Sequence, residues 1–541
     1  MSYLFDKPIN EPVKNYSPGS IEKESLKRKL SELKSQQIEV PLIIDGNEIK
    51  TSNTSTIDMP HNHEIQLGKF YMASRDEIDL AIESNLKAWH SWSKVSLMER
   101  CSIFNKAADL LSTTWRDTIN AATMLNMSKN VYQAEIDAAC EMIDFFRFNC
   151  WYAFELNKQQ PMYSTEFVKN SLEMRPLEGF VFAVSPFNFA SIGGNLPSSP
   201  ALMGNVSLWK PASSAVLPAY FIMKLLEEAG LPDGVINFVP GSGKDIGPRA
   251  LESPDLAGIH FTGSTKVFKG MWKTVGNNID NYKTYPRIVG ETGGKDFCIA
   301  HESANTEILV TAMIRGAFEY QGQKCSAMSR AYIPSTIWPE VKDLYEKEVN
   351  KIKMGDPEDF SNFMNAVIDK SAFDSIKNYI DYASTSTEAE ILTGGKCDDS
   401  KGYFIEPTTI TTSNPKFKTM CEEIFGPILT IYIYDPIKWD EVLKLVDNTS
   451  NYALTGCVIS EDDDAIINAK DMLKHSAGNF YINDKPTGAV VGQQPFGGSR
   501  ASGTNDKAGS MFNLIRWVSM RTIKETLDSP KDFRYPFMGE E

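Results

Sequence analysis

Four short apolar segments, separated by helical or polar sequence, limit the possible folds of this chain more than any other feature. They are GFVFAVSP (179–186), SLWKP (207–211), VINFVPG (235–241) and GIHFTGS (258–264). The segment AVLPAYFIMKLLEEAG ends at Gly230 with Pro232 beyond it, which is a common way for a helix to stop. Short apolar strands that alternate with helices form a parallel sheet covered on both faces. We therefore predict an α/β fold that binds ligands at the carboxyl ends of these strands.

A second α/β region is predicted from about residue 291 to residue 488. DFCIA (296–300) has the composition of a buried strand, and the following segment has the apolar spacing of one helix face. We expect this helix to end at Gly322, which leaves Cys325 in the next loop. The acidic run 461–464 precedes another helical segment, where carboxylates favour the positive end of the helix dipole.

The region before the first sheet is predicted to be helical from residue 76 to about residue 158. Within it, residues 134–156 are expected to form one long apolar helix. Glu141 is the exception there, because an acid among apolar neighbours needs a partner. Residues 1–40 are predicted to be an N-terminal extension with a short amphipathic helix. Its apolar positions are Leu26, Leu30 and Leu33.

Length and composition exclude several classes of protein. The chain has 541 residues, too many for one compact core, so two or three domains are expected. A formal net charge of −15 argues against nucleic-acid binding. No segment approaches the roughly 18 to 20 apolar residues that a membrane helix needs. The eight cysteines form no C-x-x-C pair, and His61 and His63 are only a weak metal signal, so we predict no metal site and a small-molecule partner.

One cysteine lies in a setting that suits a nucleophile. GQKCS (322–326) places the Cys325 thiol beside Lys324, and a neighbouring cation can polarise a thiol toward thiolate. This signal is weak alone, because most single cysteines are buried apolar residues.

Two further motifs strengthen the interpretation. Glu291 in ETGGK precedes two glycines that let the backbone approach a ligand, so it suits a general base, although it can also be a paired acid at a strand end. Asn188 in SPFNF is either an Asx-turn residue or a donor to a developing oxyanion, worth roughly 2.7 to 4 kcal/mol. A nucleophile, an oxyanion donor and a base beside a nucleotide-binding sheet fit aldehyde oxidation through a covalent thiohemiacetal.

Six sequence blocks then resemble one family in that family's order. The blocks are SPFNF, WKP, FTGS, ETGGK, GQKCS and EEIFGP, and the resemblance to the aldehyde dehydrogenase superfamily runs from about residue 40 to residue 525. Three longer segments resemble the branch of that superfamily that oxidises L-glutamate γ-semialdehyde to L-glutamate in proline catabolism. They are EMIDFFRFN, FNFASIGGNLPSSPALMGN and TGAVVGQQPFGGSRASGTNDKAG.

The resemblance implies a role for each matching residue. Cys325 is the nucleophile, Asn188 and the Cys325 backbone N–H form the oxyanion hole, and Glu291 activates the water that cleaves the thioester. Phe189 and Phe496 enclose the aliphatic part of the substrate. The remaining implied substrate-binding residues are Glu141, toward the α-ammonium, Lys324 near it, and Ser326, Gly488 and Ala489 around the α-carboxylate. Many relatives carry Ser where this chain has Ala489, so we expect weaker substrate binding and not a different substrate.

The implied cofactor is NAD, although GSGKDIG (241–247) is not a proper G-x-G-x-x-G motif. Ser213 stands where many NAD-preferring relatives have Glu, and the absence of that acid leaves NADP open. The implied cofactor-binding residues are Ser185, Lys210, Ser213, Gly263, Ser264, Glu423 and Phe425. Gly263 and Ser264 are expected at a helix start, where backbone N–H groups favour the pyrophosphate.

The resemblance also implies the domain organisation of an aldehyde dehydrogenase fold. After the 1–40 extension, a Rossmann-like NAD-binding domain comprises residues 41–160 and 177–290, and the α/β catalytic domain comprises residues 291–488. Residues 489–510 form the substrate loop and the return to the first domain. A β-hairpin oligomerisation arm is expected at 161–176, with 511–530 extending a partner's sheet in a homodimer or homohexamer.

Two alternatives and the cellular compartment remain open. The first alternative is another semialdehyde, or acyl transfer to coenzyme A, although Glu291 argues for hydrolysis. The second is a non-catalytic protein that keeps the fold, which Cys325 and Glu291 together disfavour. The family implies the mitochondrial matrix. The N-terminus has Asp6 and Glu11 and no Arg before Arg28, which is a poor presequence, so the cytoplasm is the alternative.

Overall fold

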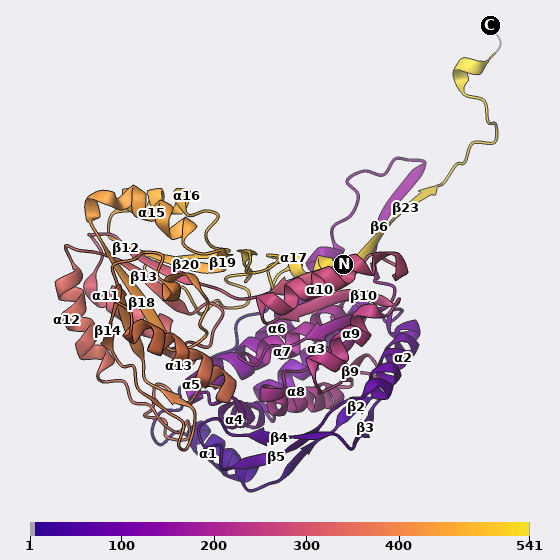
Figure 1. The fold of residues 1–541 in the computed structure, drawn as a ribbon. Helices are drawn as coiled ribbons and strands as arrows, with labels where there is room; N and C mark the ends of the chain where they lie inside the picture. Colours follow the sequence, from indigo (N-terminus) through magenta and orange to yellow (C-terminus); the bar gives the residue numbers. More distant parts are fainter. Residues whose placement is uncertain (1–5, 540–541) are drawn as a thin grey trace.

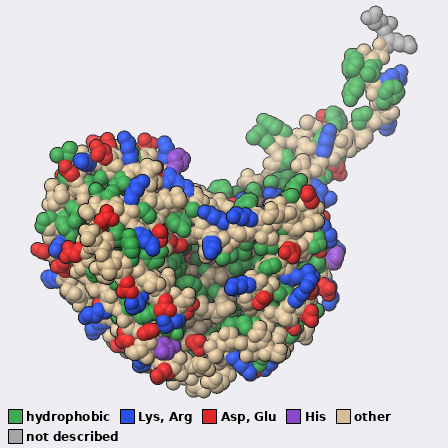
Figure 2. Space-filling view, viewed as in Figure 1, with side chains coloured by type: hydrophobic (Ala, Val, Ile, Leu, Met, Phe, Trp, Pro, Cys, Tyr) green, Lys and Arg blue, Asp and Glu red, His purple; other side chains and the backbone are tan. Residues whose placement is uncertain are grey.

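The computed structural model describes residues 6–539, so the first five residues of the predicted extension lie outside it. Two lobes, each built around a seven-stranded sheet, make up the body, and a thin arm projects from one of them (Figure 1). Figure 2 shows a hollow between the two lobes. The α/β fold with two sheets is therefore confirmed.

The first sheet contains the four apolar segments predicted as strands. Its order is β11 (Arg287–Glu291), β10 (Leu256–Thr262), β7 (Phe180–Val184), β8 (Val206–Lys210), β9 (Ile236–Phe238), β2 (Leu42–Ile44) and β3 (Asn47–Ile49). The first five strands are parallel, and β2 and β3 add an antiparallel edge. Helices α7 (Ala190–Leu202) and α2 (Arg75–Trp92) both pack on β7 and β8, whose residues are almost all buried, so both faces are covered.

Helix ends in this lobe follow the local sequence signals. Helix α8 (Val216–Ala229) stops at Gly230, whose φ of +98° is a left-handed conformation that glycine adopts without strain. Helix α10 (Thr265–Asn277) begins directly after Ser264, at the end of β10, as predicted. Helix α9 (Gly243–Glu252) begins after Ser242, whose hydroxyl accepts from the Lys244 N–H.

The helical region before the sheet is confirmed, with one irregular turn. It comprises α2, α3 (Leu97–Ser112), α4 (Arg116–Met127), α5 (Val131–Ala134), the π-helix η1 (Glu135–Glu141) and α6 (Met142–Asn157). The expected long helix at 134–156 is thus a π-helical turn that continues into α6. Wide turns of this kind occur often at functional sites.

The amphipathic helix predicted in the N-terminal extension is α1 (Ile21–Lys34). Leu26, Leu30 and Leu33 are its buried residues, and the helix packs on α4. Burial of each leucine is worth about 2 kcal/mol, which is enough to hold a single short helix on the body.

The second sheet has the order β14 (Ala389–Thr393), β17 (Thr408–Thr412), β18 (Ile428–Tyr434), β13 (Met328–Pro334), β12 (Asp296–Ala300), β20 (Thr455–Ile459) and β21 (Asn479–Ile482). All neighbours are parallel except β14 with β17. The acidic run at 461–464 does precede a helix, α16 (Asp463–Met472), where the Asp462 carboxylate accepts from the Ala465 N–H.

The helix before the nucleophile loop ends earlier than predicted. Helix α11 (Thr306–Phe318) stops at Phe318, and a 3₁₀ turn, η4 (Glu319–Gly322), follows it. Tyr320 and Gln321 have φ of 51° and 55°. The Gln321 amide donates to the carbonyls of Ser128 and Ala366, and we attribute the early end of the helix to these tertiary contacts.

The arm is present, but its two strands are not those expected. Residues 161–176 reverse direction at a tight turn, where Thr165 and Val168 form an antiparallel bridge, and the chain then continues as the long strand β6 (Val168–Pro176). Strand β6 pairs antiparallel with β23 (Val518–Thr526) from the C-terminal segment (Figure 1). The chain therefore turns back where a hairpin was predicted, but the long backbone partner of β6 comes from 342 to 358 residues away in the sequence, and no local pattern indicates it.

Within residues 6–539, no helix is long and apolar enough to cross a membrane. The same residues contain no group of three or more His, Cys, Asp or Glu side chains placed to hold a metal ion.

Candidate active site

Cys325 lies in a buried loop between η4 and β13, at the point where the two lobes meet. The thiol residue is 9% exposed. Gly294 of ETGGK packs so closely on the Cys325 carbonyl that a side chain there would clash with it. Gly322 packs in the same way on the Gly426 carbonyl. Three predicted motifs, ETGGK, GQKCS and EEIFGP, therefore converge around one loop, and a narrow cavity is lined by residues of all three.

Asn188 reaches this loop from the other lobe. It follows β7, is 4% exposed, and its amide nitrogen donates to the Gln323 carbonyl at 3.0 Å. This bond holds the amide two residues from Cys325 and leaves its second N–H available. The geometry suits a donor to the oxyanion that forms on a carbonyl oxygen when the sulfur adds to the carbonyl carbon.

Glu291 is the last residue of β11, at the carboxyl edge of the first sheet. One carboxylate oxygen accepts from the Gly498 N–H at 3.0 Å. Burial raises the pKa of the Glu291 carboxyl well above its usual range, an effect that the Gly498 hydrogen bond and Lys507 oppose. A carboxyl group with a raised pKa is a better proton acceptor once it is ionised.

The electrostatic environment of the thiol differs from the one predicted. Burial raises the pKa of Cys325 well above its usual range, and the charges of Asp296, Glu291 and Glu423 raise it further. Lys324 does not activate the thiol, because its ammonium is paired with the Glu319 carboxylate at 3.0 Å. The expected thiolate stabilisation by Lys324 was therefore wrong, since the neighbouring cation is already neutralised.

Asp296 is a residue that sequence reasoning missed. Its Oδ1 accepts from the Thr455 N–H at 2.7 Å, whereas Oδ2 has no hydrogen-bond partner within residues 6–539. Burial raises the pKa of this carboxyl well above its usual range. No sequence signal separates Asp296 from an ordinary acid at a strand start, because its proximity to Cys325 depends on how β12 and the nucleophile loop pack.

Phe189 and Glu141 meet at a buried ionic cluster. The Lys129 ammonium pairs with Asp137 at 2.7 Å and lies 4.2 Å from the centre of the Phe189 ring. Asp137 also accepts from the backbone N–H of Ala190 and from the Ser191 hydroxyl, and the same hydroxyl oxygen lies 2.6 Å from the Glu141 carboxyl group.

This cluster places Glu141 beside the start of α7. Burial, followed by the charge of Asp137, raises the pKa of Glu141 to about 8. Sequence analysis missed Lys129 and Asp137. Asp137 carried the signal that singled out Glu141, namely an acid among apolar neighbours, four residues earlier in the same segment.

The segment 487–494, here called the anchor loop, contains the predicted carboxylate-binding residues Gly488 and Ala489. It is joined to the nucleophile loop, because the hydroxyls of Thr487 and Ser326 lie 2.8 Å apart. Gly488 has a φ of +99°. The predicted Phe496 follows the loop, half-buried, and its backbone pairs with Ala508. Thr487 was not predicted, although it directly precedes Gly488.

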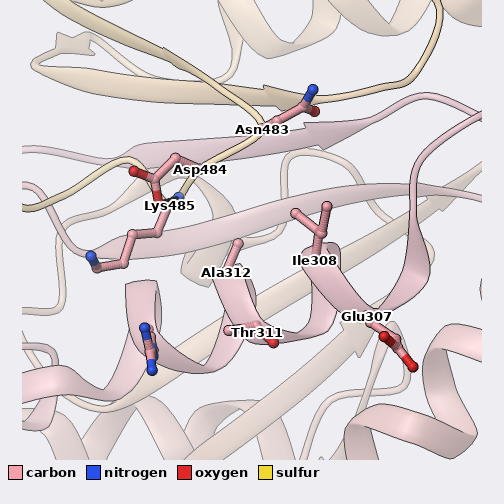
Figure 3. Close-up of a pocket in the computed structure, with 8 residues that line it drawn as sticks. Glu307, Ile308, Thr311, Ala312, Asn483, Asp484 and Lys485 are labelled. Atoms are coloured by element: carbon pink, nitrogen blue, oxygen red, sulfur yellow. Dashed lines mark hydrogen bonds between the residues drawn. The ribbon is translucent and has the colours of Figure 1, made fainter.

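A surface cavity of about 350 Å³ lies outside this constellation, between α11 and residues 483–485 (Figure 3). Its lining includes Glu307, Asp484, Arg315 and Lys485, which are two acids and two bases. None of the predicted site residues lines it, so we do not assign it to the chemistry at Cys325.

The predicted cofactor residues Lys210, Ser213, Gly263 and Ser264 lie at or just beyond the carboxyl ends of strands β8 and β10 of the first sheet. Ser264 precedes α10 without a side-chain cap, and the first turn of the helix has no acid, so its free N–H groups suit an anion. Burial lowers the pKa of Lys210 to about 8. Ser213 is exposed in a short 3₁₀ turn. The Gly263 N–H donates to the Glu291 carbonyl, which links the cofactor edge to the base.

The other predicted cofactor residues have internal partners. Glu423 accepts from the Gly294 N–H at 2.9 Å, and burial raises its pKa to about 7. Phe425 has a φ of +60° and packs edge-on against Phe187. Ser185 donates to the Gly193 carbonyl and accepts from Trp209, so its hydroxyl ties α7 to β8.

Known proteins share both this sequence and this structure. The aldehyde dehydrogenase family model matches residues 49–523. Delta-1-pyrroline-5-carboxylate dehydrogenase, mitochondrial, of Dictyostelium discoideum is 52% identical over 98% of this chain and 96% of its own length, and the human protein of that name is 48% identical over 98% and 94%. The delta-pyrroline-5-carboxylate dehydrogenase of Mycobacterium tuberculosis bound with NAD superposes over both whole chains with a TM-score of 0.96 at 47% identity. The chain therefore belongs to the aldehyde dehydrogenase family.

Proposed function

We propose that this enzyme oxidises L-glutamate γ-semialdehyde, formed from Δ1-pyrroline-5-carboxylate, to L-glutamate with NAD, the second step of proline degradation. One observation supports the chemistry. The Asn188 amide of the first lobe donates to the Gln323 carbonyl, two residues before Cys325, and strand β11 of the same lobe ends at the base, Glu291. The substrate assignment is supported by relatives that match nearly the whole chain at 48–52% identity.

The first half of the reaction uses the thiol and the amide. The Cys325 sulfur adds to the aldehyde carbon and gives its proton to solvent water as the S–C bond forms, and the carbonyl oxygen becomes an oxyanion near the Asn188 amide. A positioned donor of this kind is worth roughly 2.7 to 4 kcal/mol in the transition state. Loss of hydride from the same carbon then leaves a thioester on Cys325.

The second half of the reaction needs a base. Glu291 removes a proton from water as the water oxygen attacks the thioester carbon, and the Cys325 sulfur leaves and regains a proton. The Gly498 N–H fixes one oxygen of the base, so the other can face the water. Because Glu291 serves water, hydrolysis is favoured over acyl transfer to coenzyme A.

The residues at the sheet edge fit a dinucleotide. The uncapped start of α10 offers backbone N–H groups to a pyrophosphate, and Lys210 and Ser213 would reach the adenosine ribose. Glu423 and Phe425 would hold the nicotinamide ribose. Bound NAD supplies the hydride acceptor and a positively charged ring. Since Ser213 provides no carboxylate to repel a 2′-phosphate, NADP is the second candidate cofactor.

The substrate groups match the charges around the nucleophile. Glu141 would receive the α-ammonium, and Ser326 with the backbone of Gly488 and Ala489 would receive the α-carboxylate. Phe189, fixed by the Lys129 ammonium, and Phe496 would enclose the methylene groups.

The two catalytic substitutions should fail at different steps. With Δ1-pyrroline-5-carboxylate and NAD, Cys325→Ser should show no NADH formation above background, because no covalent adduct forms. Glu291→Gln should produce a burst near one NADH per active site, followed by a steady rate reduced by about 10²- to 10⁴-fold, because the thioester accumulates. Stopped-flow absorbance of NADH measures both.

Propanal provides the control for substrate class. The wild-type enzyme should have a larger kcat/KM for the semialdehyde than for propanal at equal enzyme concentration. The reverse order would reject the substrate assignment, and activity retained by Cys325→Ser would reject the mechanism.

We also propose that the chain forms a homodimer or homohexamer through its arm. Met162, Tyr163 and Phe167 are 86%, 76% and 54% exposed at the start of the arm, and Met520 is 50% exposed on β23. Exposed apolar side chains on a projecting strand pair are typical of a surface that a second chain covers. Relatives named as mitochondrial support the mitochondrial matrix as the compartment, with the cytoplasm as the alternative that cell fractionation would detect.

A further inference from the structure

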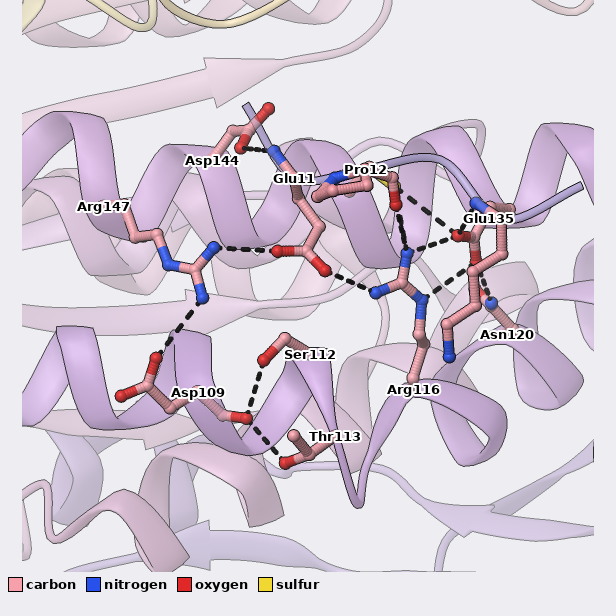
Figure 4. Close-up of polar contacts among 12 residues, drawn as sticks. Glu11, Pro12, Asp109, Ser112, Thr113, Arg116, Asn120, Glu135, Asp144 and Arg147 are labelled. Carbon is pink, nitrogen blue, oxygen red and sulfur yellow. Dashed lines mark hydrogen bonds and ion pairs between the residues drawn. The ribbon is translucent and has the colours of Figure 1, made fainter. Parts of the chain in front are cut away.

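The N-terminal segment 6–20, here called the strap, forms no helix or strand and is hydrogen-bonded to residues of α4, η1 and α6. Figure 4 shows its part at Glu11 and Pro12. Glu11 bridges two arginines, with one oxygen 2.6 Å from Arg116 and the other 2.8 Å from Arg147. Further along, the buried Tyr16 hydroxyl donates to Glu135 at 2.8 Å, and the Lys14 N–H donates to the same carboxylate. The strap is therefore fixed at two separate points on the helices.

Asn10 precedes both of these points in the sequence, and it connects the strap to the anchor loop. Its amide nitrogen donates to the Val491 carbonyl at 2.7 Å and to Asp144 at 2.8 Å, and its amide oxygen accepts from Gln493 at 2.9 Å. The Asn10 amide therefore uses both of its N–H groups and its oxygen, and these bonds connect the strap with α6 and with the anchor loop. Because both donors and the acceptor of this amide have partners, the hydrogen bonds favour one position of the anchor loop.

The anchor loop is held on its other side by apolar packing. The Val491 side chain forms a small cluster with Phe145 and Phe148 of α6. Gly492 lies so close to the Phe148 ring that any side chain there would clash. The loop is thus held between this aromatic pair and the strap.

The helices beneath the strap extend into the substrate site. Glu135 and Asp144 bind the strap, whereas Asp137 and Glu141 of the same helical segment bind Ser191 at the start of α7. The strap therefore contacts both sides of the predicted amino-acid pocket: the helix that carries Glu141 and the loop that carries Gly488 and Ala489.

We propose that the strap is a positioning element of the substrate site, in which Asn10 sets the place of the anchor loop and thereby the affinity for an aldehyde that carries an α-carboxylate. This rests on the proposed function, because the anchor loop is assigned to the carboxylate there. Asn10 touches neither substrate nor cofactor in this assignment, so it acts through the loop.

The test compares Asn10→Ala with Asn15→Ala in the full-length enzyme. Asn15 is an exposed residue of the same strap, and its side chain accepts from the Ser17 N–H within the strap. Asn10→Ala should raise KM for the semialdehyde about five- to tenfold, the size expected for one or two lost hydrogen bonds, with kcat and KM for NAD within about twofold. Its kcat/KM for propanal should be unchanged, and Asn15→Ala should match wild type throughout.

Hydrogen–deuterium exchange of residues 488–494 separates the strap from the substrate assignment, because it needs no substrate. Exchange there should be faster in Asn10→Ala than in Asn15→Ala. Equal exchange and equal KM in the two variants would overturn the role of the strap. Faster exchange in an enzyme whose wild type does not prefer the semialdehyde to propanal would leave the strap in place and overturn the proposed substrate.

Discussion

Cys325 lies among three carboxyl groups, Asp296, Glu291 and Glu423, and burial, followed by these groups, raises the pKa of its thiol well above the usual range. Burial also raises the pKa of each of these three carboxyl groups, so the same enclosure disfavours charge on the thiol and on the acids around it. Lys324 does not offset the raised pKa of the thiol, because its ammonium is already paired with the Glu319 carboxylate. At the scale of single residues, the structure therefore places the nucleophile in a setting that opposes thiolate formation.

The raised pKa of Glu141, about 8, predicts a pH dependence of substrate choice. Above this pKa the carboxylate is ionised and attracts the α-ammonium, whereas below it the neutral acid does not. The ratio of kcat/KM for the semialdehyde to kcat/KM for propanal should therefore rise severalfold from about pH 7 to about pH 8.5. Taking the ratio cancels the ionisation of Cys325 and Glu291, which act on both substrates.

Glu141→Gln is the control for this dependence. The variant should have a lower ratio that is flat with pH, while its propanal activity stays close to wild type. A wild-type ratio that is already flat would mean that Glu141 does not face the ammonium group.

At the scale of elements, the short turn η4 decides where the nucleophile stands. Gly322 ends this turn with a φ of +67° and packs directly on the Gly426 carbonyl. A side chain at residue 322 would strain the backbone and would clash with the Gly426 carbonyl. This one glycine therefore allows the GQKCS loop and the EEIFGP segment to pack against each other.

Gly322→Ala should therefore lower kcat by about 10- to 100-fold, because a displacement near 1 Å at the nucleophile has that effect. It should also lower the free energy of unfolding by about 1–3 kcal/mol through backbone strain. Steady-state kinetics and urea denaturation measure the two effects.

Gly276→Ala in α10 is the matched control, since a Cβ there meets nothing within 4 Å. It should leave both quantities unchanged or stabilise the helix slightly. Similar losses in the two variants would show that Gly322 has no special role.

At the scale of the whole molecule, the arm and the two-lobed body have separate tasks. Strand β23 carries Ile523, which is 38% exposed, on an arm that contacts little of its own body (Figure 1). An apolar strand pair of this kind is costly in a monomer and useful in an interface.

Ile523→Lys should convert the proposed oligomer to a form with the mass of a single chain, as measured by light scattering after size exclusion. Ile437→Lys is the control, because Ile437 is 92% exposed on the opposite lobe. If Ile523→Lys keeps the wild-type mass, or if wild type is already monomeric, the arm is not the interface.

Local pattern predicted much of the fold and part of the site. Apolar strands and the stop at Gly230 were predicted correctly because each depends on neighbouring residues alone, whereas the start of α10 at Ser264 followed from the resemblance. The convergence of the sequence motifs at Cys325 followed from a resemblance, not from spacing. Lys129 and Asp296 were missed, since their significance lies in contacts with residues distant in the chain, such as Phe189 and Thr455. Asp137 was missed although it carries the same local signal as Glu141.

The sequence by itself determined the two α/β regions, the helices before them and the residue types needed for aldehyde oxidation, because periodicity and side-chain chemistry are local properties. Only the tertiary structure decided that β23 pairs with β6, that Glu319 neutralises Lys324 and that Asn10 holds the anchor loop. These depend on which distant groups share a buried surface, where a charge must find a partner and a backbone must find a hydrogen bond.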